Sequence, residues 1–308
     1  MRGMRPVHVA LALLVAAIWG LNFVVIEVGL DDFPPLLLSA LRFALAALPL
    51  LILRGGPGVP WRWIVAVAVA IGVVKFSLLF VGMDIGMPAG LASLVLQVQA
   101  FFTLGFAAVL LRERVRPLQA IGLVLATGGL ALVATGLDGL ATPGGFLLVI
   151  AAAAAWGVGN VAIKRASPAD PFRFMTWWCV IPPLPLLALS VAFEGPAEIS
   201  RALSGIDLGG IGAVAYIAFA ATTVGWGLWA YLMRLYSAST VAPFSLLVPV
   251  FGLGFAALLL GEPLGIRTLI AAGLVVSGVL LTQRAPRISP QIATIPGRPA
   301  LRGEAGAG

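Results

Sequence analysis

The sequence predicts an all-α integral membrane protein in which ten transmembrane helices form two inverted five-helix repeats, with the N- and C-termini cytoplasmic. Three observations support this fold: the composition, the series of apolar segments and an internal repeat. Of the 308 residues, 61% are hydrophobic and 10% are charged, whereas soluble domains carry about 25% charged residues. The composition is therefore typical of proteins that live in a lipid bilayer.

Ten apolar segments are long enough to cross a bilayer, which takes about 20 residues of helix. Short separators rich in Gly, Pro, Asp or Arg divide them. The first segment is too long for the apolar core of a signal peptide, so we expect it to be a retained helix. The predicted spans are residues 7–29, 35–53, 61–83, 88–111, 117–136, 143–165, 171–193, 208–234, 238–260 and 266–283.

The basic residues indicate which side each loop faces. If the spans alternate in direction, fifteen of the nineteen Lys and Arg residues fall on the N-terminal side and two on the opposite side, while Arg42 and Lys75 lie within spans. Lys and Arg accumulate on the cytoplasmic side, so both termini are predicted to be cytoplasmic. Because the basic residues are scattered over short loops, the net charge of +7 does not indicate nucleic-acid binding.

An internal repeat relates the two halves of the chain. Residues 102–115 read FTLGFAAVLLRERV, and residues 251–264 read FGLGFAALLLGEPL. Further matches near the start of each half are Trp19 with Trp156, Gly20 with Gly157 and, less closely, Asn22 with Asn160.

The repeat predicts two domains, residues 1–137 and 138–284, followed by a disordered cytoplasmic tail over 285–308, which is rich in Pro, Gly and Arg. Each domain holds five spans. Because five is an odd number, the second copy is inverted in the membrane. Inverted repeats are the architecture of secondary transporters, whose binding site lies near the midplane.

The residue types argue against catalysis and against a bound metal or cofactor. Cys179 is the single cysteine and His8 the single histidine, and the sequence contains no phosphate-binding loop. We therefore expect no enzyme, since a membrane enzyme needs a nucleophile, an acid–base pair or a metal cluster. A channel is a less favoured alternative, because channels usually build their polar rings by oligomer symmetry.

Several strings resemble the drug/metabolite transporter superfamily and, within it, the EamA-type exporters. The resemblance rests on Trp19-Gly20-Leu21-Asn22-Phe23, on residues 34–43, on Gly86-Met87-Pro88-Ala89-Gly90-Leu91-Ala92-Ser93, on residues 239–250 and on Gly261-Glu262. It covers about residues 8–283 and is similar in particular to bacterial exporters of O-acetylserine, cysteine and other amino-acid metabolites. Lys75 departs from the exporter pattern. The family's substrate is therefore not carried over directly to this chain.

The resemblance implies a multi-pass protein of the bacterial inner membrane that exports amino acids or related small metabolites by alternating access. Non-amino-acid metabolites or drugs are the alternative cargo. The implied partners are a small amphipathic substrate and the lipid bilayer, with no nucleic acid, and the implied state is a monomer or a weak homodimer.

Polar and aromatic residues inside the spans are the candidates for a substrate site. A charge at the middle of a span costs about 2.5–3.5 kcal/mol, so Lys75 is expected either to attract a substrate carboxylate or to bond backbone carbonyls. Trp226 and Trp229 lie well inside the eighth span, away from the ends where interfacial aromatic residues belong. The predicted substrate-binding residues are Trp19, Asn22, Lys75, Phe80, Gln97, Phe101, Trp156, Asn160, Trp226, Trp229 and Ser245.

Other polar residues have structural interpretations. Gln97 lies on one face of the fourth span, and Gln99 and Thr103 lie on another; amides in a span bind substrate or bridge helices. Glu27 and Arg42 lie at similar depths from the periplasmic face, so we expect an ion pair between them. Glu262 and its repeat equivalent Glu113 are each expected to cap the helix that follows, at its positive N-terminus.

Overall fold

The computed structural model describes residues 4–53, 55–111, 117–135, 141–236 and 238–284, and over these residues every regular element is a helix. The predicted tail, 285–308, and Glu113 lie outside the described residues. Two shorter apolar helices cover Pro35–Leu51 and Ile266–Leu281. Eight helices are long and apolar enough to cross a membrane: Pro6–Asp32, Trp61–Asp84, Ala89–Leu111, Pro117–Ala134, Pro143–Ala166, Pro171–Phe193, Leu208–Leu235 and Ala242–Leu260.

Several of these helices change their hydrogen-bonding register along their length and therefore carry more than one label. Proline stands at the first turn of many of them, where its fixed φ suits a helix and its missing N–H is not needed. The elements of the first half are α1 (Pro6–Asp32), α2 (Pro35–Ala46), η1 (Leu48–Leu51), α3 (Trp61–Val67), η2 (Ala68–Lys75), α4 (Phe76–Asp84), α5 (Ala89–Val95), η3 (Leu96–Val98), α6 (Gln99–Leu111) and α7 (Pro117–Ala134).

The second half adds a short helix, α11, between its second and third long helices. Its elements are α8 (Pro143–Ala166), α9 (Pro171–Trp178), α10 (Pro183–Phe193), α11 (Pro196–Ser204), α12 (Leu208–Ala215), η4 (Tyr216–Val224), α13 (Gly225–Leu235), α14 (Ala238–Val241), η5 (Ala242–Leu247), α15 (Val248–Phe255), η6 (Ala256–Leu260) and α16 (Ile266–Arg284).

Four of the changes of register fall at matching places in the two halves, whereas η1 and η6 have no counterpart among the described residues. The third long helix of each half contains a π-helical stretch, η2 in the first and η4 in the second. The fourth long helix of each half contains a 3₁₀ stretch, η3 or η5. π-Helical turns are rare and occur frequently at functional sites, so the two third helices are the first places to look for one.

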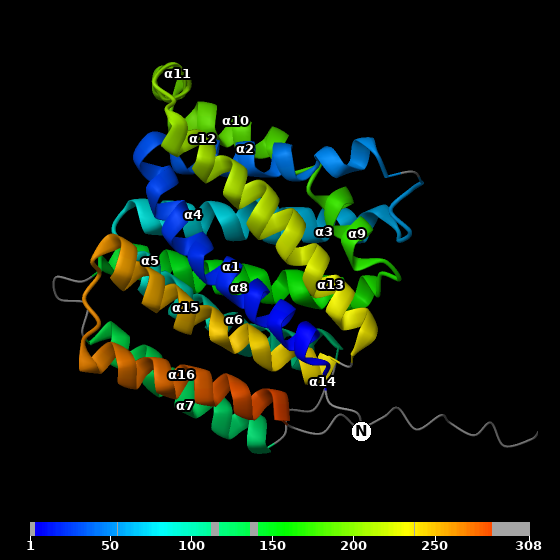
Figure 1. The fold of residues 1–308 in the computed structure, drawn as a ribbon, viewed down its shortest axis with the longest axis vertical. Coiled ribbons are helices and arrows are strands. Elements are labelled where there is room, and N and C mark those ends of the chain that lie inside the picture. Colours follow the sequence, from blue (N-terminus) through cyan, green and yellow to red (C-terminus); the bar gives the residue numbers. More distant parts are fainter. Residues whose placement is uncertain (1–3, 54, 112–116, 136–140, 237, 285–308) are drawn as a thin grey trace, which may run out of the picture.

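The first helix of each half packs mainly against helices of the other half. α1 lies against α12, α13 and α15, and α8 lies against α3, α4 and α6 (Figure 1). The backbones approach closely at matching glycines. A Cβ atom on Gly20 would lie 2.5 Å from the Cβ of Phe251, and one on Gly157 would lie 2.8 Å from the Cβ of Phe102. Phe102 and Phe251 are equivalent in the sequence repeat, so both halves use the same contact.

Two helix pairs form the edges of the molecule. α7 packs along α16 at one edge, and α2 packs along α10 at the other (Figure 1). The equivalent residues Gly129 and Gly278 both lie in the first of these contacts, facing Ala271 and Gly122 respectively. The remaining long helices stand between these two edges and enclose the core.

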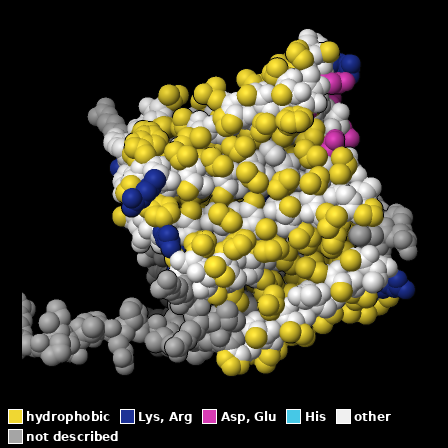
Figure 2. Space-filling view, turned by 180° about the vertical axis from the view of Figure 1, so that it is seen from behind, with side chains coloured by type: hydrophobic (Ala, Val, Ile, Leu, Met, Phe, Trp, Pro, Cys, Tyr) yellow, Lys and Arg dark blue, Asp and Glu magenta, His cyan; other side chains and the backbone are white. Residues whose placement is uncertain are grey.

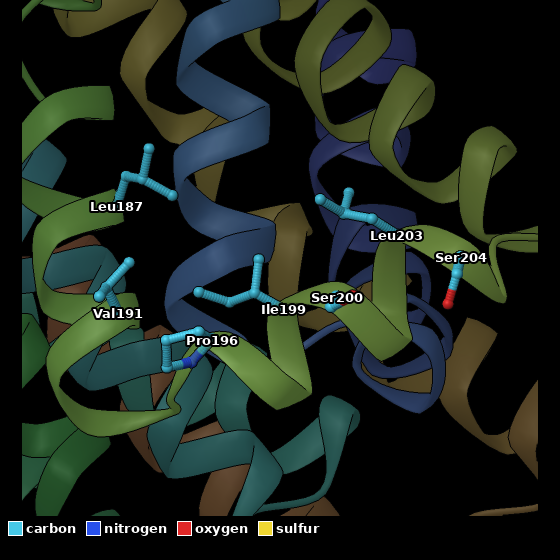
Figure 3. A pocket seen from close by; sticks show the side chains of 7 residues that line it. All are labelled: Leu187, Val191, Pro196, Ile199, Ser200, Leu203 and Ser204. Atoms are coloured by element: carbon cyan, nitrogen blue, oxygen red, sulfur yellow. The ribbon is translucent and has the colours of Figure 1, made fainter.

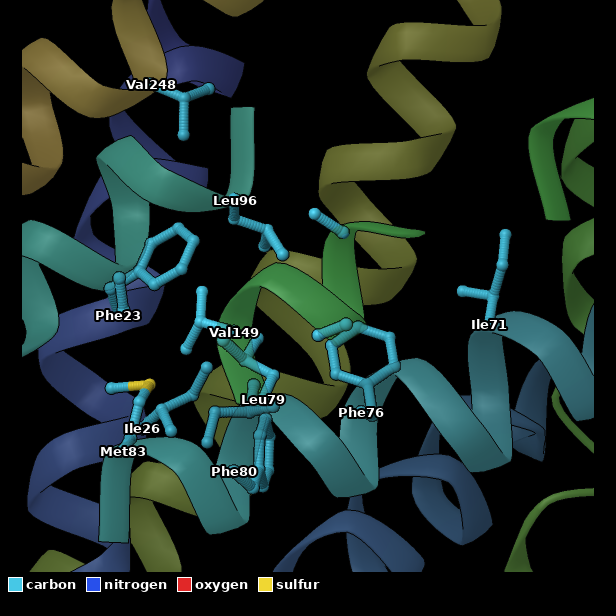
Figure 4. Close-up of a cluster of buried hydrophobic side chains, with 14 of the residues drawn as sticks. Phe23, Ile26, Ile71, Phe76, Leu79, Phe80, Met83, Leu96, Val149 and Val248 are labelled. Atoms are coloured by element: carbon cyan, nitrogen blue, oxygen red, sulfur yellow. The ribbon is translucent and has the colours of Figure 1, made fainter. Parts of the chain in front are cut away.

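One face of the molecule is apolar in its middle and carries charged side chains near its margins. Figure 2 shows a face covered by hydrophobic side chains, with basic and acidic side chains at its margins. Leu258 and Val109, for example, are 80% and 76% exposed. Inside, Phe23, Phe76 and Phe80 belong to a continuous hydrophobic core drawn from both halves (Figure 4). An apolar exterior of this kind suits a lipid environment.

Candidate functional site

Two basic side chains lie buried in this apolar core and share one aromatic ring. Lys75 and Arg42 are each 4% exposed. The Lys75 Nζ lies 3.3 Å, and the Arg42 Cζ 3.8 Å, from the centroid of the Phe76 ring. The Lys75 Nζ also lies 4.6 Å from the centroid of the Trp156 ring. We call Arg42, Lys75, Phe76 and Trp156 the cationic centre; desolvated cation–π contacts contribute about 2 kcal/mol each.

Thr222 of η4 holds the Arg42 side chain. The Arg42 Nε and Nη2 donate to the Thr222 Oγ1 at 3.2 and 3.0 Å. The Thr222 hydroxyl in turn donates to the carbonyl of Ile217, five residues earlier, at 2.8 Å. This five-residue step belongs to the π-helical register of η4. Because the Thr222 hydroxyl donates its proton to Ile217, the lone pairs of its oxygen can accept from the Arg42 guanidinium.

The charges of the cationic centre are not neutralised by carboxylates. Among the described residues, no carboxylate forms an ion pair with Arg42 or Lys75. Arg201 and Glu198 do form an ion pair, but at the exposed surface. The expected ion pair between Glu27 and Arg42 is therefore wrong. The Arg42 Nη1 and the Glu27 Oε2 are both buried without a hydrogen-bond partner. The physical reason is that Thr222, from the other half of the chain, reaches Arg42 in place of Glu27.

Three tryptophans predicted for the site do come together. The Trp19 ring lies 5.9 Å from that of Trp226 and 5.3 Å from that of Trp229. The Trp19 Nε1 donates to the carbonyl of Ala221 at 2.9 Å. We call these three residues the tryptophan cluster. Because Ala221 precedes Thr222, η4 joins this cluster to the cationic centre.

The two tryptophans that match in the sequence repeat occupy matching places. Trp156 contacts Lys75, the last residue of η2, and Trp19 contacts Ala221 in η4. Each therefore meets the π-helical stretch of the opposite half. The partners differ, since one is a charged side chain and the other a backbone carbonyl. The two tryptophans thus have equivalent positions in the two halves but contact chemically different groups.

The predicted amide and hydroxyl residues bond mostly within the helical frame. The Asn160 Nδ2 donates to the Gln99 Oε1 at 2.7 Å and to the Thr103 Oγ1 at 3.0 Å, which ties α8 to α6. The Gln97 Nε2 donates to the Ser93 carbonyl at 3.4 Å.

Four further candidates lie in other surroundings. The Ser245 Oγ donates to the Ala242 carbonyl at 2.8 Å. Phe80 (Figure 4) and Phe101 lie in the hydrophobic core. Asn22 is buried and its Oδ1 has no partner. Of these residues, Asn22 is the one with an unused polar atom.

Two glutamates cap helices of the opposite half at the periplasmic ends predicted above. The Glu262 carboxylate accepts a hydrogen bond from the backbone N–H of Gly90 at 3.1 Å, so it caps α5. The expectation that Glu262 caps the helix that follows it is therefore wrong. Burial raises the pKa of Glu262, and the backbone N–H donors of Gly90 and Ala89 partly offset this. Glu194 accepts from the N–H of Leu36 at 2.6 Å and caps α2.

An apolar groove lies apart from these groups. It runs between α10 and α11 and opens to the surface (Figure 3). It contains no charged side chain and shares no residue with the cationic centre or the tryptophan cluster. Its lining residues are Leu187, Val191, Pro196, Ile199, Ser200, Leu203 and Ser204. We therefore do not place a site for a polar metabolite there.

Comparison with known proteins identifies the family. A model of the EamA-like transporter family matches residues 7–135 and again residues 143–284. The chain belongs to this family. It is a multi-pass membrane transporter, not an enzyme.

A curated relative from Salmonella typhimurium, named "Probable amino-acid metabolite efflux pump", is 43% identical over 277 residues, which cover 88% of this chain and 93% of that protein. An inner membrane transporter of Escherichia coli, YedA, is 27% identical over 278 residues, covering 86% of each chain. One solved structure superposes with a TM-score of 0.62 at 19% identity, over 91% of this chain and 98% of that one. This last likeness concerns the fold alone.

The unpaired charge of Lys75 yields a first prediction. Replacing Lys75 with Met removes a buried charge but keeps the length of the side chain. We expect the variant to be more stable than the wild type by about 1–3 kcal/mol, because an unneutralised buried charge is costly, and to lose transport. Thermal unfolding of the detergent-solubilised protein measures the first effect, with Arg62→Met as a control at an exposed site in α3. A lower stability of the Lys75→Met protein would make Lys75 a structural residue.

Proposed function

We propose that the protein is a secondary transporter that exports amino acids or related small metabolites across the bacterial inner membrane. The observation that carries the proposal is the cationic centre, a pair of buried unneutralised charges inside a protein of the EamA-like transporter family. Charged residues inside spans mark substrate pathways. The name of the Salmonella relative, an amino-acid metabolite efflux pump, supports the same substrate class and the outward direction.

In the proposed topology the two shorter apolar helices also cross the membrane. Pro35–Leu51 has 17 residues counted from its ends, which is at the short limit for a span. With it and with Ile266–Leu281, the chain has ten spans in two inverted five-helix repeats, and both termini are cytoplasmic. The matching glycine contacts and the matching π-helical stretches of the two halves support this arrangement.

The proposed substrate position follows from the chemistry of the two clusters. A carboxylate binds to Lys75 in the cationic centre, and the apolar part of the substrate lies toward Trp19, Trp226 and Trp229. Transporter sites combine apolar walls with a few convergent polar groups. The remaining predicted residues, Asn22, Gln97, Asn160 and Ser245, supply polar groups around this path, while Phe80 and Phe101 form its apolar walls.

The packing suggests which parts move during alternating access. Because α1 packs with α12, α13 and α15, and α8 with α3, α4 and α6, the bodies that we propose to move are mixed bundles, in place of the two halves of the sequence. We propose that these bundles rock against each other while the edge pairs α7–α16 and α2–α10 support them. The cap of α5 by Glu262 joins the two halves of the sequence at the end predicted to be periplasmic.

Counterflow in proteoliposomes tests the function. Vesicles are loaded with unlabelled amino acids, and the uptake of labelled serine, cysteine, O-acetylserine, threonine or phenylalanine is followed. We expect saturable uptake of at least one of them, stimulated by the internal substrate, and its loss in Lys75→Gln. Uptake that does not saturate would indicate a channel. If folded protein exchanges none of them, the cargo is a non-amino-acid metabolite or a drug.

A crosslink tests the rocking bundles. A Cβ on Gly90 would lie 3.2 Å from the Cβ of Ala256, close to the roughly 3.5–4.5 Å that a disulfide needs. In a Cys179→Ser background, we expect oxidation of the Gly90→Cys, Ala256→Cys protein to stop exchange and reduction to restore it. Each single-cysteine variant is the control. Full exchange by the crosslinked protein would contradict motion between α5 and η6.

Cysteine labelling tests the topology around Pro35–Leu51. Asp31 and Gly56 are exposed and flank this helix. If the helix crosses the membrane, a membrane-impermeant maleimide added to intact cells will label Asp31→Cys but will label Gly56→Cys only after permeabilisation. Labelling of both in intact cells, or of neither, would show that the helix does not span.

A further inference from the structure

A separate pocket lies at the end of the α7–α16 edge, where these two helices lie next to α5. It has a volume of about 340 Å³ and shares no residue with the cationic centre or the tryptophan cluster. The beginning of α16 contributes Gly265, Arg267 and Thr268 to its lining. Its apolar walls come from all three helices and are Leu91, Leu132, Val133 and Ile266. An occupant of this pocket therefore touches three helices at once.

Two polar side chains of the pocket have no partner in the described part of the chain. Thr268 is 9% exposed, lines the pocket and makes no hydrogen bond with another described residue. Arg267 is exposed, lines the same pocket and forms no ion pair with a described carboxylate. No acidic side chain is among the lining residues. A buried hydroxyl and a guanidinium beside the same space suit an oxygen anion, because both can donate to it.

The first turn of α16 offers further donors. The Leu269 N–H donates to the Gly265 carbonyl at 3.2 Å, and the N–H groups of the three residues before Leu269 precede the helical ladder. Gly265 has no side chain to cap them, and Glu262, the cap expected from the sequence, binds α5. Among the described residues, the positive end of α16 therefore has no cap. Phosphate groups are favourable ligands at such a helix end.

The pocket opens on a surface that suits lipid. Ile266, one of its walls, is 71% exposed, and Ile270, one turn further along α16, is 51% exposed. In a membrane such side chains are covered by acyl chains. The pocket itself lies where the apolar helix Pro117–Ala134 ends and α16 begins. The phosphate groups of a bilayer lie at the ends of membrane helices, and basic pockets between helices bind anionic headgroups there.

We infer that this pocket binds an anionic phospholipid of the surrounding membrane. Its phosphate accepts hydrogen bonds from Arg267, Thr268 and the first turn of α16, and its acyl chains lie against the apolar walls. A zwitterionic lipid fits less well, because its ammonium group lies near Arg267 and the lining contains no carboxylate to offset the repulsion. The inference concerns the contact with the bilayer and does not depend on which substrate is transported.

Thermal unfolding of the delipidated full-length protein in detergent tests the selectivity of the pocket. Phosphatidylglycerol or phosphatidylcholine is added at increasing concentration, and Tm is measured. We expect phosphatidylglycerol at about ten times its Kd to raise Tm by about 3 °C. Phosphatidylcholine at the same concentration is expected to raise it by about 1 °C or less. Equal shifts with the two lipids would overturn the inference.

A third ligand distinguishes a lipid from a free phosphate ester. Glycerol 3-phosphate contains the phosphate group but no acyl chains, so it cannot use the apolar walls of the pocket. At the same concentration we expect it to leave Tm unchanged. A shift equal to that given by phosphatidylglycerol would overturn the assignment to a lipid.

Variants place the binding at this pocket. Arg267→Gln removes the cation, and we expect the affinity for phosphatidylglycerol to fall about tenfold, so that the shift at the same concentration falls to about 1 °C. The matched control is Arg201→Gln, which removes the other exposed basic residue on the predicted periplasmic side. Leu132→Trp fills the pocket and keeps Arg267. Its control is Val124→Trp, at a position of α7 that is 71% exposed and outside the pocket.

The comparison uses the shift that lipid produces in each variant, so a change in the variant's own stability does not affect it. We expect Leu132→Trp to lose the shift and both controls to keep it. A full shift in folded Arg267→Gln and Leu132→Trp proteins would show that the lipid binds elsewhere and would overturn the inference. If neither variant folds, the preference of the wild type among the three ligands still decides.

Discussion

The rest of the structure depends on the burial of two positive charges in a protein made almost entirely of apolar residues. An ammonium or guanidinium group in such surroundings needs partners, and each one here is supplied by a different helix. Phe76 follows Lys75 in the third span, Trp156 comes from α8 and Thr222 from η4. The cationic centre can therefore form only when both halves of the chain are in place. The charges that are costly to bury also bring the two halves into register.

The π-helical stretches make this arrangement possible. A π-helical turn changes the direction in which the side chains after it point, and both third helices contain one. In η4 the shift lets Thr222 donate to the carbonyl five residues earlier and present its lone pairs to Arg42. In η2 it ends at Lys75 itself. A regular α-helix would have placed these side chains on other faces, so the distortion and the site depend on each other.

The sequence predicted much of the fold because the bilayer restricts the choices. A span must be apolar and about 20 residues long, and its loops carry a charge signal, so the helices of the structure lie where the apolar segments predicted them. Trp19 and Trp156, which match in the sequence repeat, also make matching contacts in the structure, because a duplicated sequence repeats its contacts. A local stretch of sequence does not reveal which residue a side chain contacts across a helix interface.

Arg42 shows where local reasoning fails. Its depth matched that of Glu27, but the mixed bundles place η4 against α2, and a threonine 180 residues away became the partner. Neither the π-helical register nor the interleaving of the halves leaves a periodic signal in the sequence. The pair Thr222-Thr223 inside an apolar span was the available clue, because hydroxyl side chains there bond backbone or a neighbouring helix.

The divergence of the two halves explains how a symmetric frame can hold an asymmetric substrate. Duplication gives two equivalent tryptophans, each against the π-helical stretch of the opposite half. On one side the contact is with the Lys75 side chain, which has Arg42 as a neighbour. On the other it is with the Ala221 carbonyl, and Trp226 and Trp229 lie beside it. One end of the frame is therefore strongly positive and the other aromatic. The two ends of the frame therefore offer different partners, basic side chains at one end and aromatic faces at the other.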